Sequence, residues 1–309
     1  IWEYFYLSDV LRMTGIDVYH ATALSGPLKA DIKRVSSCFD FIPLRYKDDV
    51  YSSFFKELRK KVQYRFFLKA LKTSRHVISI SDYTKSEVVK YLNINPERIT
   101  TVYLGFSSDF KCEPNPKIFE ILKVRYNIRF PYLLYVGCTD ERKNVPALIN
   151  ACITLIREQG QQIQLVVVGN KCKNIQLMEE NVRKEGMDDR FIFTGIIPQV
   201  ELIALYNHAR LFCFPSLEEG FGLPVIEAMA CGLPVVAYNC KAVAEVAGDS
   251  CIIVNNMQED FFNAVNKILY DEVLWNLYRE KGLKRAQRYS WKKTATETLH
   301  IYHKISTHK

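Results

Sequence analysis

The chain has 309 residues, of which 48% are hydrophobic and 13% aromatic, and it is long enough for one large domain or two of ordinary size. No segment reaches the ~20 uncharged apolar residues that a membrane-spanning helix needs, and the first residues lack a signal-peptide pattern. The net charge of +8 is common for a solvated surface, but it also favours anionic partners such as nucleotide phosphates or lipid headgroups.

The first half of the sequence predicts an alternation of strands and helices. Short apolar runs predict strands at Asp17–His20, Val35–Phe39, His76–Ile80 and Thr100–Leu104. A long helix is expected over Tyr51–Thr73. Pro114 and Pro116 then mark a loop, and we place the end of a first domain, residues 1–115, in it.

The predicted helix Tyr51–Thr73 is strongly basic. Its one acid is Glu57, whereas its basic residues are Lys56, Arg59, Lys60, Lys61, Arg65, Lys69 and Lys72. Apolar residues follow helical spacing at Phe55, Leu58, Val62, Phe66 and Ala70. Such a helix is typical of binding to an anionic membrane surface. A helix that packs its apolar side on the core and solvates its charges has the same pattern, so both interpretations stay open.

The second half alternates more clearly. Runs rich in Val, Ile, Leu or Phe predict strands at Tyr132–Gly137, Ile163–Gly169, Phe191–Gly195, Leu211–Pro215, Pro234–Tyr238 and Cys251–Val254. Helix-like segments separate them at Val145–Gln159, Asn174–Glu185, Gln199–Ala209 and Pro224–Cys231. This order predicts a parallel, doubly wound α/β sheet in a second domain, residues 116–290. A last helix near Trp291–Lys304 follows the completed sheet, and we expect residues 291–309 to return to the first domain.

The nine cysteines are scattered along the chain, and no two of them form a Cys-x-x-Cys pair. Several stand inside apolar runs, such as Cys213 in Leu211–Phe214. Buried reduced thiols of a cytosolic protein are therefore favoured over disulfides. No His/Cys cluster has the spacing of zinc ligands.

One segment, Ser216–Pro234, combines two carboxylates with a glycine-rich turn and the start of a helix. Glu219 and Glu227 stand eight positions apart, and Pro224 occupies a first helical position, which suits its fixed φ angle. Carboxylates are good acceptors for sugar hydroxyls. Acidic residues in the first turn of a surface helix are the simpler interpretation.

The turn between these carboxylates favours an anion. The backbone N–H groups of Phe221, Gly222 and Leu223 have no acceptor within the helix, and the helix dipole adds to their effect. Glycine at this place lets the backbone approach a phosphate closely. A phosphate site beside two carboxylates suits a nucleotide-sugar and therefore predicts glycosyl transfer.

The same segment resembles the signature of the retaining family-4 glycosyltransferases. The matching strings are Glu219-x7-Glu227, Gly220-Phe-Gly-Leu-Pro224 and Glu227-Ala-Met-Ala-Cys-Gly-Leu-Pro-Val-Val236. The resemblance covers most of the chain, because Tyr135–Asn144 is similar to the family's first donor-domain loop. Shorter similar strings are Phe193–Gly195, Leu205–Tyr206, Glu245–Gly248, Tyr289–Lys292 and, more weakly, Ile78–Asp82 and Val102–Gly105.

The resemblance implies a GT-B architecture, in which two Rossmann-like domains face a cleft and the second holds the nucleotide. It implies that Glu227 holds the ribose, Glu219 the transferred sugar, and Arg142 with Lys143 the diphosphate. The residues that it implies in donor binding are Gly137, Gly195, Ile197, Gly220, Phe221, Gly222, Leu223 and Glu227. Those that it implies in catalysis are Glu219, Arg142 and Lys143.

The basic pair Arg142 and Lys143 also has a chemical rationale. A leaving nucleoside diphosphate gains negative charge as the glycosidic bond breaks, and two fixed cations stabilise that charge. No Asp-x-Asp metal motif is found, so we expect no metal and no other cofactor. Taken alone, the pair also fits a solvated loop.

The sequence departs from the family at several places. Cys138 stands where relatives often carry Arg, and Phe39 stands where they often carry His ahead of Asp40. His20, near a strand end, is a second candidate on the acceptor side, although a lone His there is more often structural. The chain starts beyond the family's usual first strand and glycine-rich loop, so we expect an acceptor domain that is incomplete at its N-terminus.

We therefore expect a retaining hexosyltransferase that uses GDP-mannose or a UDP-sugar and extends a surface glycan on a glycan or lipid-linked acceptor. The string Asp40–Leu44 hints at the mannosyltransferase branch. We expect a cytoplasmic protein, peripheral on the inner face of the membrane through helix 51–73, and no nucleic-acid partner. Two alternatives stay open: a non-catalytic nucleotide-sugar-binding subunit, and an epimerase or phosphorylase of the same architecture.

Overall fold

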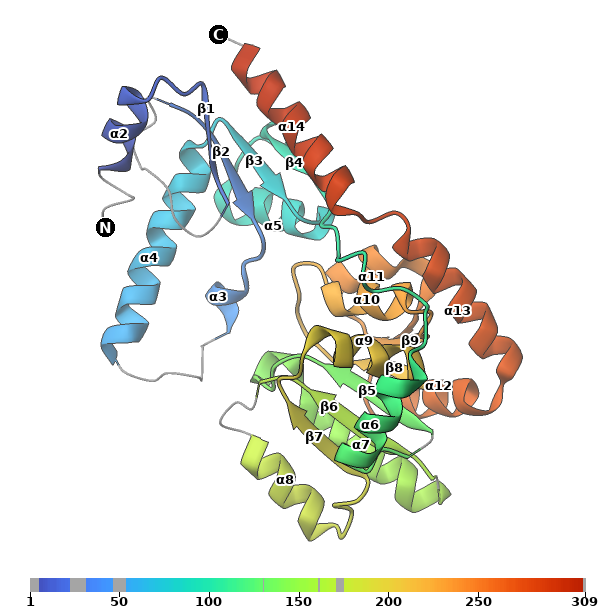
Figure 1. The fold of residues 1–309 in the computed structure, drawn as a ribbon. Helices are drawn as coiled ribbons and strands as arrows, with labels where there is room; N and C mark the ends of the chain where they lie inside the picture. Colours follow the sequence, from blue (N-terminus) through green and yellow to red (C-terminus); the bar gives the residue numbers. More distant parts are fainter. Residues whose placement is uncertain are drawn as a thin grey trace. The chain divides into compact units, whose positions relative to one another are not determined.

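The computed structural model describes residues 6–22, 32–46, 54–129, 131–160, 162–170 and 175–307. The chain divides into two compact units (Figure 1). Unit 1 consists of Ile1–Gly105 and Tyr289–Lys309, and unit 2 consists of Phe106–Arg288. Unit 1 is therefore built from two separate stretches of chain, whereas unit 2 is continuous.

Unit 1 contains a four-stranded parallel sheet in the order β1-β2-β3-β4. Its strands are β1 (Val18–Ala21), β2 (Lys33–Cys38), β3 (His76–Ser79) and β4 (Ile99–Thr101). Its helices are α2 (Leu7–Met13), α3 (Ile42–Arg45), α4 (Phe54–Thr73), α5 (Asp82–Leu92), the short η1 (Pro96–Arg98) and α14 (Trp291–Thr307).

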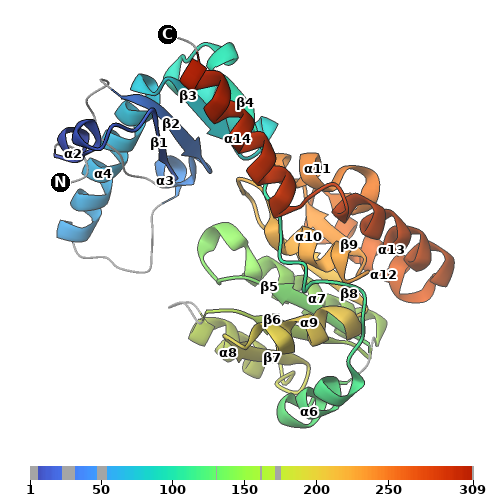
Figure 2. The same ribbon diagram turned by 45° about the horizontal axis from the view of Figure 1, so that its top comes forward.

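The sheet of unit 1 is covered on both faces, because neighbouring residues of a strand point to opposite sides. Val77 packs with the α4 and α5 residues Phe67 and Val88, and Ile78 packs with Ile301 and Ile305 of α14. Figures 1 and 2 show α14 running along this sheet. Unit 1 thus takes one of its two helical layers from the last helix of the chain.

The long helix α4 buries a different face from the predicted one. Its buried side chains are Tyr64, Phe67, Ala70 and Leu71. Of the predicted apolar face, Leu58 and Val62 are 49% and 44% exposed and Phe66 is half-buried, so only Ala70 of its four described side chains is buried. Residues three and four apart lie on one helix face, and the Tyr64-Phe67-Leu71 stripe is the one aligned with the sheet. The residues Tyr51–Ser53 and the side chains of Phe55, Lys56, Glu57 and Lys60 lie outside the described part.

Unit 2 contains a six-stranded parallel sheet in the order β10-β9-β8-β5-β6-β7. Its strands are β5 (Tyr132–Val136), β6 (Gln164–Val168), β7 (Phe191–Gly195), β8 (Leu211–Phe214), β9 (Val235–Tyr238) and β10 (Ile252–Val254). Its helices are α6 (Pro116–Tyr126), η2 (Glu141–Lys143), α7 (Val145–Gln159), α8 (Ile175–Lys184), α9 (Gln199–His208), α10 (Leu223–Ala230), α11 (Lys241–Ala247), η3 (Gly248–Ser250), α12 (Glu259–Tyr270) and α13 (Glu272–Ala286). All ten strands predicted from the sequence are present in the two sheets.

The sheet of unit 2 lies between two helical layers. Leu133 and Tyr135 of β5 point into a core that also contains Leu148 of α7, Met178 of α8 and Phe261 of α12. The alternate residue Tyr132 points the other way, where its hydroxyl donates to the carbonyl of Leu205 in α9 (2.8 Å). Helices α7, α8 and α12 therefore cover one face, and α9 covers the other.

The chain passes into unit 2 earlier than the predicted boundary at residue 115. Phe110 packs edge-to-face on Tyr206, with ring centroids 5.9 Å apart, and Asn207 donates to the carbonyl of Lys111 (3.1 Å). These contacts fasten residues 106–115 to unit 2, so the division falls after Gly105. At the other end it falls after Arg288, just before α14 begins at Trp291.

The eight cysteines of the described residues are free thiols, and most of them are buried. Cys172 lies outside the described part. None of the helices in the described ranges is long and apolar enough to cross a membrane.

Candidate functional site

The strand order of unit 2 creates a switch point between β5 and β8. These strands are neighbours, but the chain continues from β5 into α7 and from β8 into α10. Helix α7 belongs to the face with α8 and α12, whereas α10 contacts α13 and α11. Loops that leave toward opposite faces separate, and ligands of open α/β sheets bind in the crevice between them. The loops after β5 and β8 are therefore the expected place for a site.

The loop after β5 fits closely against the neighbouring strand end. The Gly137 N–H donates to the carbonyl of Val168 (2.9 Å). A Cβ on Gly169 would lie 1.9 Å from the Gly137 carbonyl oxygen, and the φ angle of Gly169 is +146°. Only glycine meets both conditions at residue 169. The resulting contact fixes where the loop leaves the sheet.

Asp140 then organises the two cations that follow. It stands at the start of η2, where its Oδ1 accepts the Lys143 N–H (3.1 Å) and its Oδ2 lies 3.6 Å from Nη2 of Arg142. The Cys138 thiol donates to the same Oδ2 (2.9 Å). Burial and this hydrogen bond raise the pKa of Cys138, so the thiol stays protonated. Cys138 thus supplies a neutral donor to Asp140.

Glu219, in the loop after β8, meets both cations. Its Oε1 lies 3.0 Å from Nη1 of Arg142 and 2.5 Å from Nζ of Lys143. The side chains of Arg142, Lys143 and Glu219 are only 15%, 11% and 12% exposed. Burial lowers the pKa of Arg142, but Glu219 and Asp140 more than offset it, so the net change is upward.

Backbone contacts hold the same two loops together. Arg142 Nη1 donates to the carbonyl of Glu218 (2.8 Å), and the Leu217 N–H donates to the carbonyl of Arg142 (2.9 Å). The position of Arg142 therefore rests on both loops and not on one ion pair alone.

The turn before α10 presents backbone amides beside these charges. Gly222 stands just before the helix with φ +102°, and a Cβ there would lie 3.1 Å from Cγ2 of Val243. Leu223 and Pro224 open the helix, one residue before the predicted start. The first N–H groups of a helix have no acceptor within it, and they carry the positive end of its dipole. Glu219 and this helix start thus belong to one loop.

Glu227 lies one turn inside α10, half-buried. Its Oε2 accepts a hydrogen bond from the Tyr206 hydroxyl (3.3 Å), and Tyr206 is fully buried. Burial raises the pKa of Glu227, and the hydrogen bond from Tyr206 offsets this in part. Tyr206 therefore orients a carboxylate whose other oxygen can accept from a ligand.

Two buried hydroxyls at the switch point lack a partner. Thr139 is in the loop after β5 and Ser216 in the loop after β8, and both are at most 2% exposed. Within the described residues, neither hydroxyl oxygen has a hydrogen-bond partner. Unsatisfied buried polar groups are rare, so their position in these two loops sets the region apart from the core.

Sequence reasoning missed the supporting residues Asp140, Tyr206, Thr139 and Ser216 as contributors to the site. An Asp two residues ahead of a basic pair, as in Asp140-Glu-Arg-Lys143, was the available signal for Asp140. The string Leu205–Tyr206 resembles the family but carries no role by itself. The roles of Tyr206, Thr139 and Ser216 depend on contacts between elements that are distant in sequence.

The structure brings together Arg142, Lys143, Glu219 and the Gly220–Glu227 segment. Gly137 lies at the start of the same loop. Gly195 ends β7, two strands along the sheet from β5, and Ile197 follows it half-buried. These two share the carboxyl edge of the sheet with the other predicted residues but not their ionic contacts.

The two acceptor-side candidates belong to unit 1. His20 is the last but one residue of β1, and both its ring nitrogens are engaged: Nε2 with Ser37 Oγ (2.9 Å) and Nδ1 with the Tyr302 hydroxyl of α14. Burial lowers its pKa, which favours the neutral ring. Asp40 accepts the Ile42 N–H through Oδ1 (3.0 Å) at the start of α3, and Phe39 beside it is 38% exposed.

The described residues contain no group of three or more His, Cys, Asp or Glu side chains arranged to hold a metal ion. The charged side chains described for the site are the two cations with Glu219 and Asp140, and Glu227 one turn inside α10. This arrangement can bind an anion next to a hydroxyl-rich group.

Comparison with known families assigns both halves of the chain. The family model described as glycosyl transferases group 1 matches residues 120–289. The model described as Glycosyltransferase Family 4 matches residues 1–110. The first match contains the whole site at the switch point.

Among curated proteins, similar relatives include two from Escherichia coli. The O-antigen chain mannosyltransferase B is 30% identical over 235 residues, covering 75% of this chain and 61% of that protein. The serotype-specific mannosyltransferase WbdA is 29% identical over 295 residues, covering 93% of this chain and 36% of that protein. The chain thus spans less than two thirds of each relative.

Solved structures share the fold. A glycosyltransferase from Rickettsia africae has a TM-score of 0.76 at 17% identity, covering 98% of this chain and 80% of that one. WaaG, a glycosyltransferase involved in lipopolysaccharide biosynthesis, has a TM-score of 0.73 at 21% identity, covering 96% and 80%. Both likenesses support the architecture of two parallel-sheet units.

Proposed function

Because this chain belongs to the group 1 glycosyltransferases, with a family 4 glycosyltransferase domain in its first half, we propose that it transfers a hexose from a nucleoside diphosphate sugar to a glycan or lipid-linked acceptor. The observation that carries the proposal is the contact of Glu219 with both Arg142 and Lys143 at the switch point of unit 2. This contact places a carboxylate, which can accept hydrogen bonds from sugar hydroxyls, beside two cations, which can bind phosphate.

The proposed reaction places each group on a different part of the donor. Arg142, Lys143 and the amides of Gly220–Leu223 bind the diphosphate, because hydrogen bonds between charged partners are stronger than neutral ones and a helix N-terminus attracts anions. Glu219 then accepts from hydroxyls of the transferred hexose. Glu227, oriented by Tyr206, accepts from the ribose hydroxyls.

The bond changes follow from this placement. The bond from the anomeric carbon to the diphosphate oxygen breaks, and its electron pair stays on that oxygen. The acceptor hydroxyl oxygen bonds to the anomeric carbon on the same face, with retention, and its proton passes to the leaving diphosphate. Arg142 and Lys143 stabilise the growing phosphate charge, which is the role that fixed donors serve in catalysis. We therefore propose that the reaction needs no metal.

GDP-mannose is the donor that we favour. The two Escherichia coli relatives are named as O-antigen or serotype-specific mannosyltransferases, which supports mannose as the transferred sugar. A UDP-sugar remains the alternative donor, because the residues of the site contact the diphosphate and sugar rather than a particular base.

A donor panel tests the proposal. Release of nucleoside diphosphate is measured with and without a mannose-terminated acceptor, in the presence of EDTA, for wild type and Glu219→Ala. We expect acceptor-dependent release that persists in EDTA and falls by roughly a hundredfold or more in the variant. Release that requires a divalent ion contradicts the metal-free part, and conversion of the free donor to its epimer shows a different reaction.

A non-catalytic, donor-binding subunit is the second candidate. The observation that favours it is Phe39, 38% exposed beside Asp40, where the family resemblance leads us to expect a His. Tight donor binding without turnover for any acceptor of the panel would support it. Recovery of turnover in Phe39→His would instead show a transferase that this residue slows.

We also propose that α4 binds an anionic membrane surface. Its exposed residues combine the cations Arg59, Lys61, Arg65 and Lys69 with the apolar Leu58 and Val62. Basic and apolar side chains on one exposed helix suit a surface of acidic headgroups, and each cation near such a surface contributes about 1 kcal/mol. This location would bring a lipid-linked acceptor to the protein.

Co-sedimentation with phosphatidylglycerol vesicles tests the membrane proposal. Neutralising Lys61, Arg65 and Lys69 with Gln should weaken binding by roughly a hundredfold or more. A control that neutralises Lys117, Lys184 and Lys267 in unit 2 removes the same charge elsewhere. Equal losses in the two triple variants would show a general charge effect and contradict a role for α4.

A further inference from the structure

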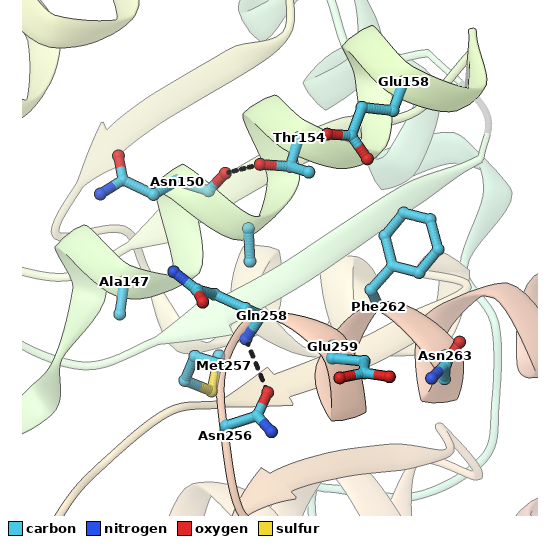
Figure 3. Close-up of a pocket in the computed structure, with 11 residues that line it drawn as sticks. Ala147, Asn150, Thr154, Glu158, Asn256, Met257, Gln258, Glu259, Phe262 and Asn263 are labelled. Atoms are coloured by element: carbon cyan, nitrogen blue, oxygen red, sulfur yellow. Dashed lines mark hydrogen bonds between the residues drawn. The ribbon is translucent and has the colours of Figure 1, made fainter.

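Unit 2 has a second hollow outside the switch point, a groove between α7 and α12 (Figure 3). Its volume is about 780 Å³, which lies within the usual range for sites that hold a small organic ligand. The α7 side is formed by Ala147, Asn150, Ala151, Thr154 and Glu158, and the α12 side by Asn256, Met257, Gln258, Glu259, Phe262 and Asn263. None of these residues has a role in the function proposed above.

Small residues on α7 explain why the groove is open. Ala147 and Ala151 are four positions apart and so lie on one face of the helix, opposite Met257 and Phe262. Phe262 stands between the two helices, and Gln258 extends toward α7 (Figure 3). The floor is thus apolar, and polar side chains line the rim.

The charge of the groove differs from that of the chain as a whole. Of the described residues that line it, none is Lys, Arg or His, whereas Glu158 and Glu259 are both acids. The chain as a whole carries a net charge of +8. A groove with carboxylates and no cation repels phosphates and acidic polymers, so its ligand is neutral or cationic.

The polar groups favour a ligand that both donates and accepts hydrogen bonds. Four primary amides, a hydroxyl and two carboxylates surround the floor, and amides offer donors and acceptors on one planar group. Asn256 uses its Oδ1 to accept the N–H groups of Gln258 (3.2 Å) and Asp260 (3.1 Å), which leaves its amide nitrogen as a donor. Vicinal hydroxyls of a sugar satisfy such a set, and the apolar face of a sugar ring suits the Phe262 ring.

We propose that this groove is a binding site for a neutral oligosaccharide, separate from the donor site. Ala147 lies in the first turn of α7, a few residues beyond Arg142 and Lys143, so one end of the groove is close to the donor loop within the same unit. A bound glycan would hold unit 2 on a polymer between transfers. The identity of this glycan as the polymer being extended rests on the proposed function. The binding of a neutral glycan in the groove does not depend on it.

Binding of a defined oligosaccharide tests the site without any turnover. Mannotetraose is titrated into the full chain and followed by calorimetry, with a tetrasaccharide of galacturonic acid as the acidic counterpart. We expect saturable binding of mannotetraose. The affinity for the acidic tetrasaccharide should be lower by roughly tenfold or more, because the two carboxylates of the groove repel it. No saturation by mannotetraose at about 10 mM, a concentration that detects even weak sites, would overturn the proposal.

Variants at the rim locate the binding. Asn263→Ala and Gln258→Ala together remove two amides from exposed positions, and we expect mannotetraose to bind roughly tenfold more weakly. Thr154→Trp should block the groove and abolish binding. Asn266→Ala on the same helix, outside the groove, is the matched control and should bind as wild type. Mannotetraose binding that survives both groove variants overturns the site.

The outcome is independent of the donor reaction. Nucleoside diphosphate binding is measured on the same variants and should stay within about twofold of wild type, which also shows that they are folded. If mannotetraose does not bind but the donor is turned over, only the groove proposal is contradicted. If mannotetraose binds but the donor is not turned over, only the proposed function is contradicted.

Discussion

Glu219 is paired with Arg142 and Lys143, yet the proposed reaction needs those cations for the diphosphate. Its Oε1 lies within 3.0 Å of both cationic groups, and all three side chains are largely buried. An arriving diphosphate must therefore compete with a carboxylate for the same partners. The competition also frees Glu219 for the hydroxyls of the transferred sugar.

Glu219→Gln should separate these two effects. Removing the competing charge should tighten binding of GDP alone by roughly fivefold, which corresponds to about 1 kcal/mol for a screened ion pair. The same variant should lose transfer activity, because the amide is a weaker acceptor for sugar hydroxyls. Calorimetry with GDP and a turnover assay give the two readouts.

Glu141→Gln provides the control for this variant. Glu141 is exposed in the same η2 turn, so its substitution removes the same charge close to the site. We expect little change in either GDP binding or turnover. If Glu219→Gln bound GDP more weakly than wild type, the competition described above would be wrong.

Glu227 should make the affinity for GDP depend on pH, with weaker binding at low pH. Burial raises its pKa above the ordinary value of 4.5, so protonation begins at a higher pH than for an exposed Glu. A protonated Glu227 accepts ribose hydroxyls poorly, and GDP affinity should fall as pH falls through this raised pKa. Glu227→Gln should bind GDP roughly tenfold more weakly at pH 7, and its affinity should not fall further as the pH is lowered.

The effect of Glu227→Gln on folding stability should be opposite to its effect on GDP binding. A carboxyl whose pKa is raised in the folded state stabilises the fold below its unfolded pKa and loses that contribution as pH rises through the folded pKa. Glu227→Gln should thus have an equal or higher melting temperature than wild type at about pH 7. A melting temperature that drops together with affinity would indicate a structural role instead.

At this scale the sequence predicted the charged residues but not their supports. These charged residues are Glu219, Glu227, Arg142 and Lys143, which stand in sequence motifs long enough to be recognised by their resemblance to the family. Tyr206 became a support of Glu227 only because a residue of α9 reaches a residue of α10, which no spacing in the sequence shows. Competition between Glu219 and a ligand likewise depends on distances across two loops.

At the scale of elements, the strands were predictable because they are buried on both faces. Val77 and Ile78, neighbours in β3, enter different cores, so apolar residues follow one another in this strand instead of alternating with polar ones. Helices gave weaker signals. The face of α4 that packs on the sheet was misjudged, because several apolar stripes compete on one helix and only tertiary contacts select among them.

Gly169 should be the most sensitive glycine at the strand ends. Gly169→Ala places a Cβ 1.9 Å from the Gly137 carbonyl oxygen at a φ angle of +146°. We expect it to destabilise unit 2 by roughly 2–4 kcal/mol and to weaken GDP binding, because the loop that carries Arg142 must shift. Denaturant unfolding and GDP calorimetry measure both.

Gly186→Ala separates sterics from backbone preference. Gly186 also has a positive φ angle, +67°, but a Cβ there meets nothing within 4 Å. We expect about 1 kcal/mol of destabilisation and unchanged GDP affinity. Equal effects of the two substitutions would show that the close contact with Gly137 does not determine the site.

At the scale of the whole molecule, α14 completes unit 1 although it follows unit 2 in the chain. Ile301 and Ile305 fill the core between α14 and the strands β2 and β3. Lys33 donates to the carbonyl of Ser306 (2.9 Å), and Thr294 donates to the carbonyl of Tyr103 (2.7 Å). The position of this helix after the completed sheet of unit 2 predicted its return to the first unit, but its partners could not be identified from the sequence.

Ile301→Asp should therefore damage one unit and spare the other. An unpaired charge at a 4% exposed position should destabilise unit 1 by several kcal/mol, whereas GDP binding by unit 2 should stay within about twofold of wild type. Transfer to acceptor should be lost. Leu299→Asp, at a 52% exposed position of the same helix, is the matched control and should leave both properties intact. Loss of GDP binding in Ile301→Asp would contradict the independence of the two units.

The discontinuity of unit 1 also has a consequence for synthesis on the ribosome. Residues 106–288 form a continuous unit that can fold as soon as they have emerged, while the β1–β4 sheet still lacks the helix that covers one of its faces. At a usual elongation rate of about 5–20 residues per second, that apolar face waits roughly ten seconds or more for α14. Unit 1 thus begins before unit 2 in the chain and is completed after it, and nascent chains between these two points should be clients of the chaperones that shield exposed sheets.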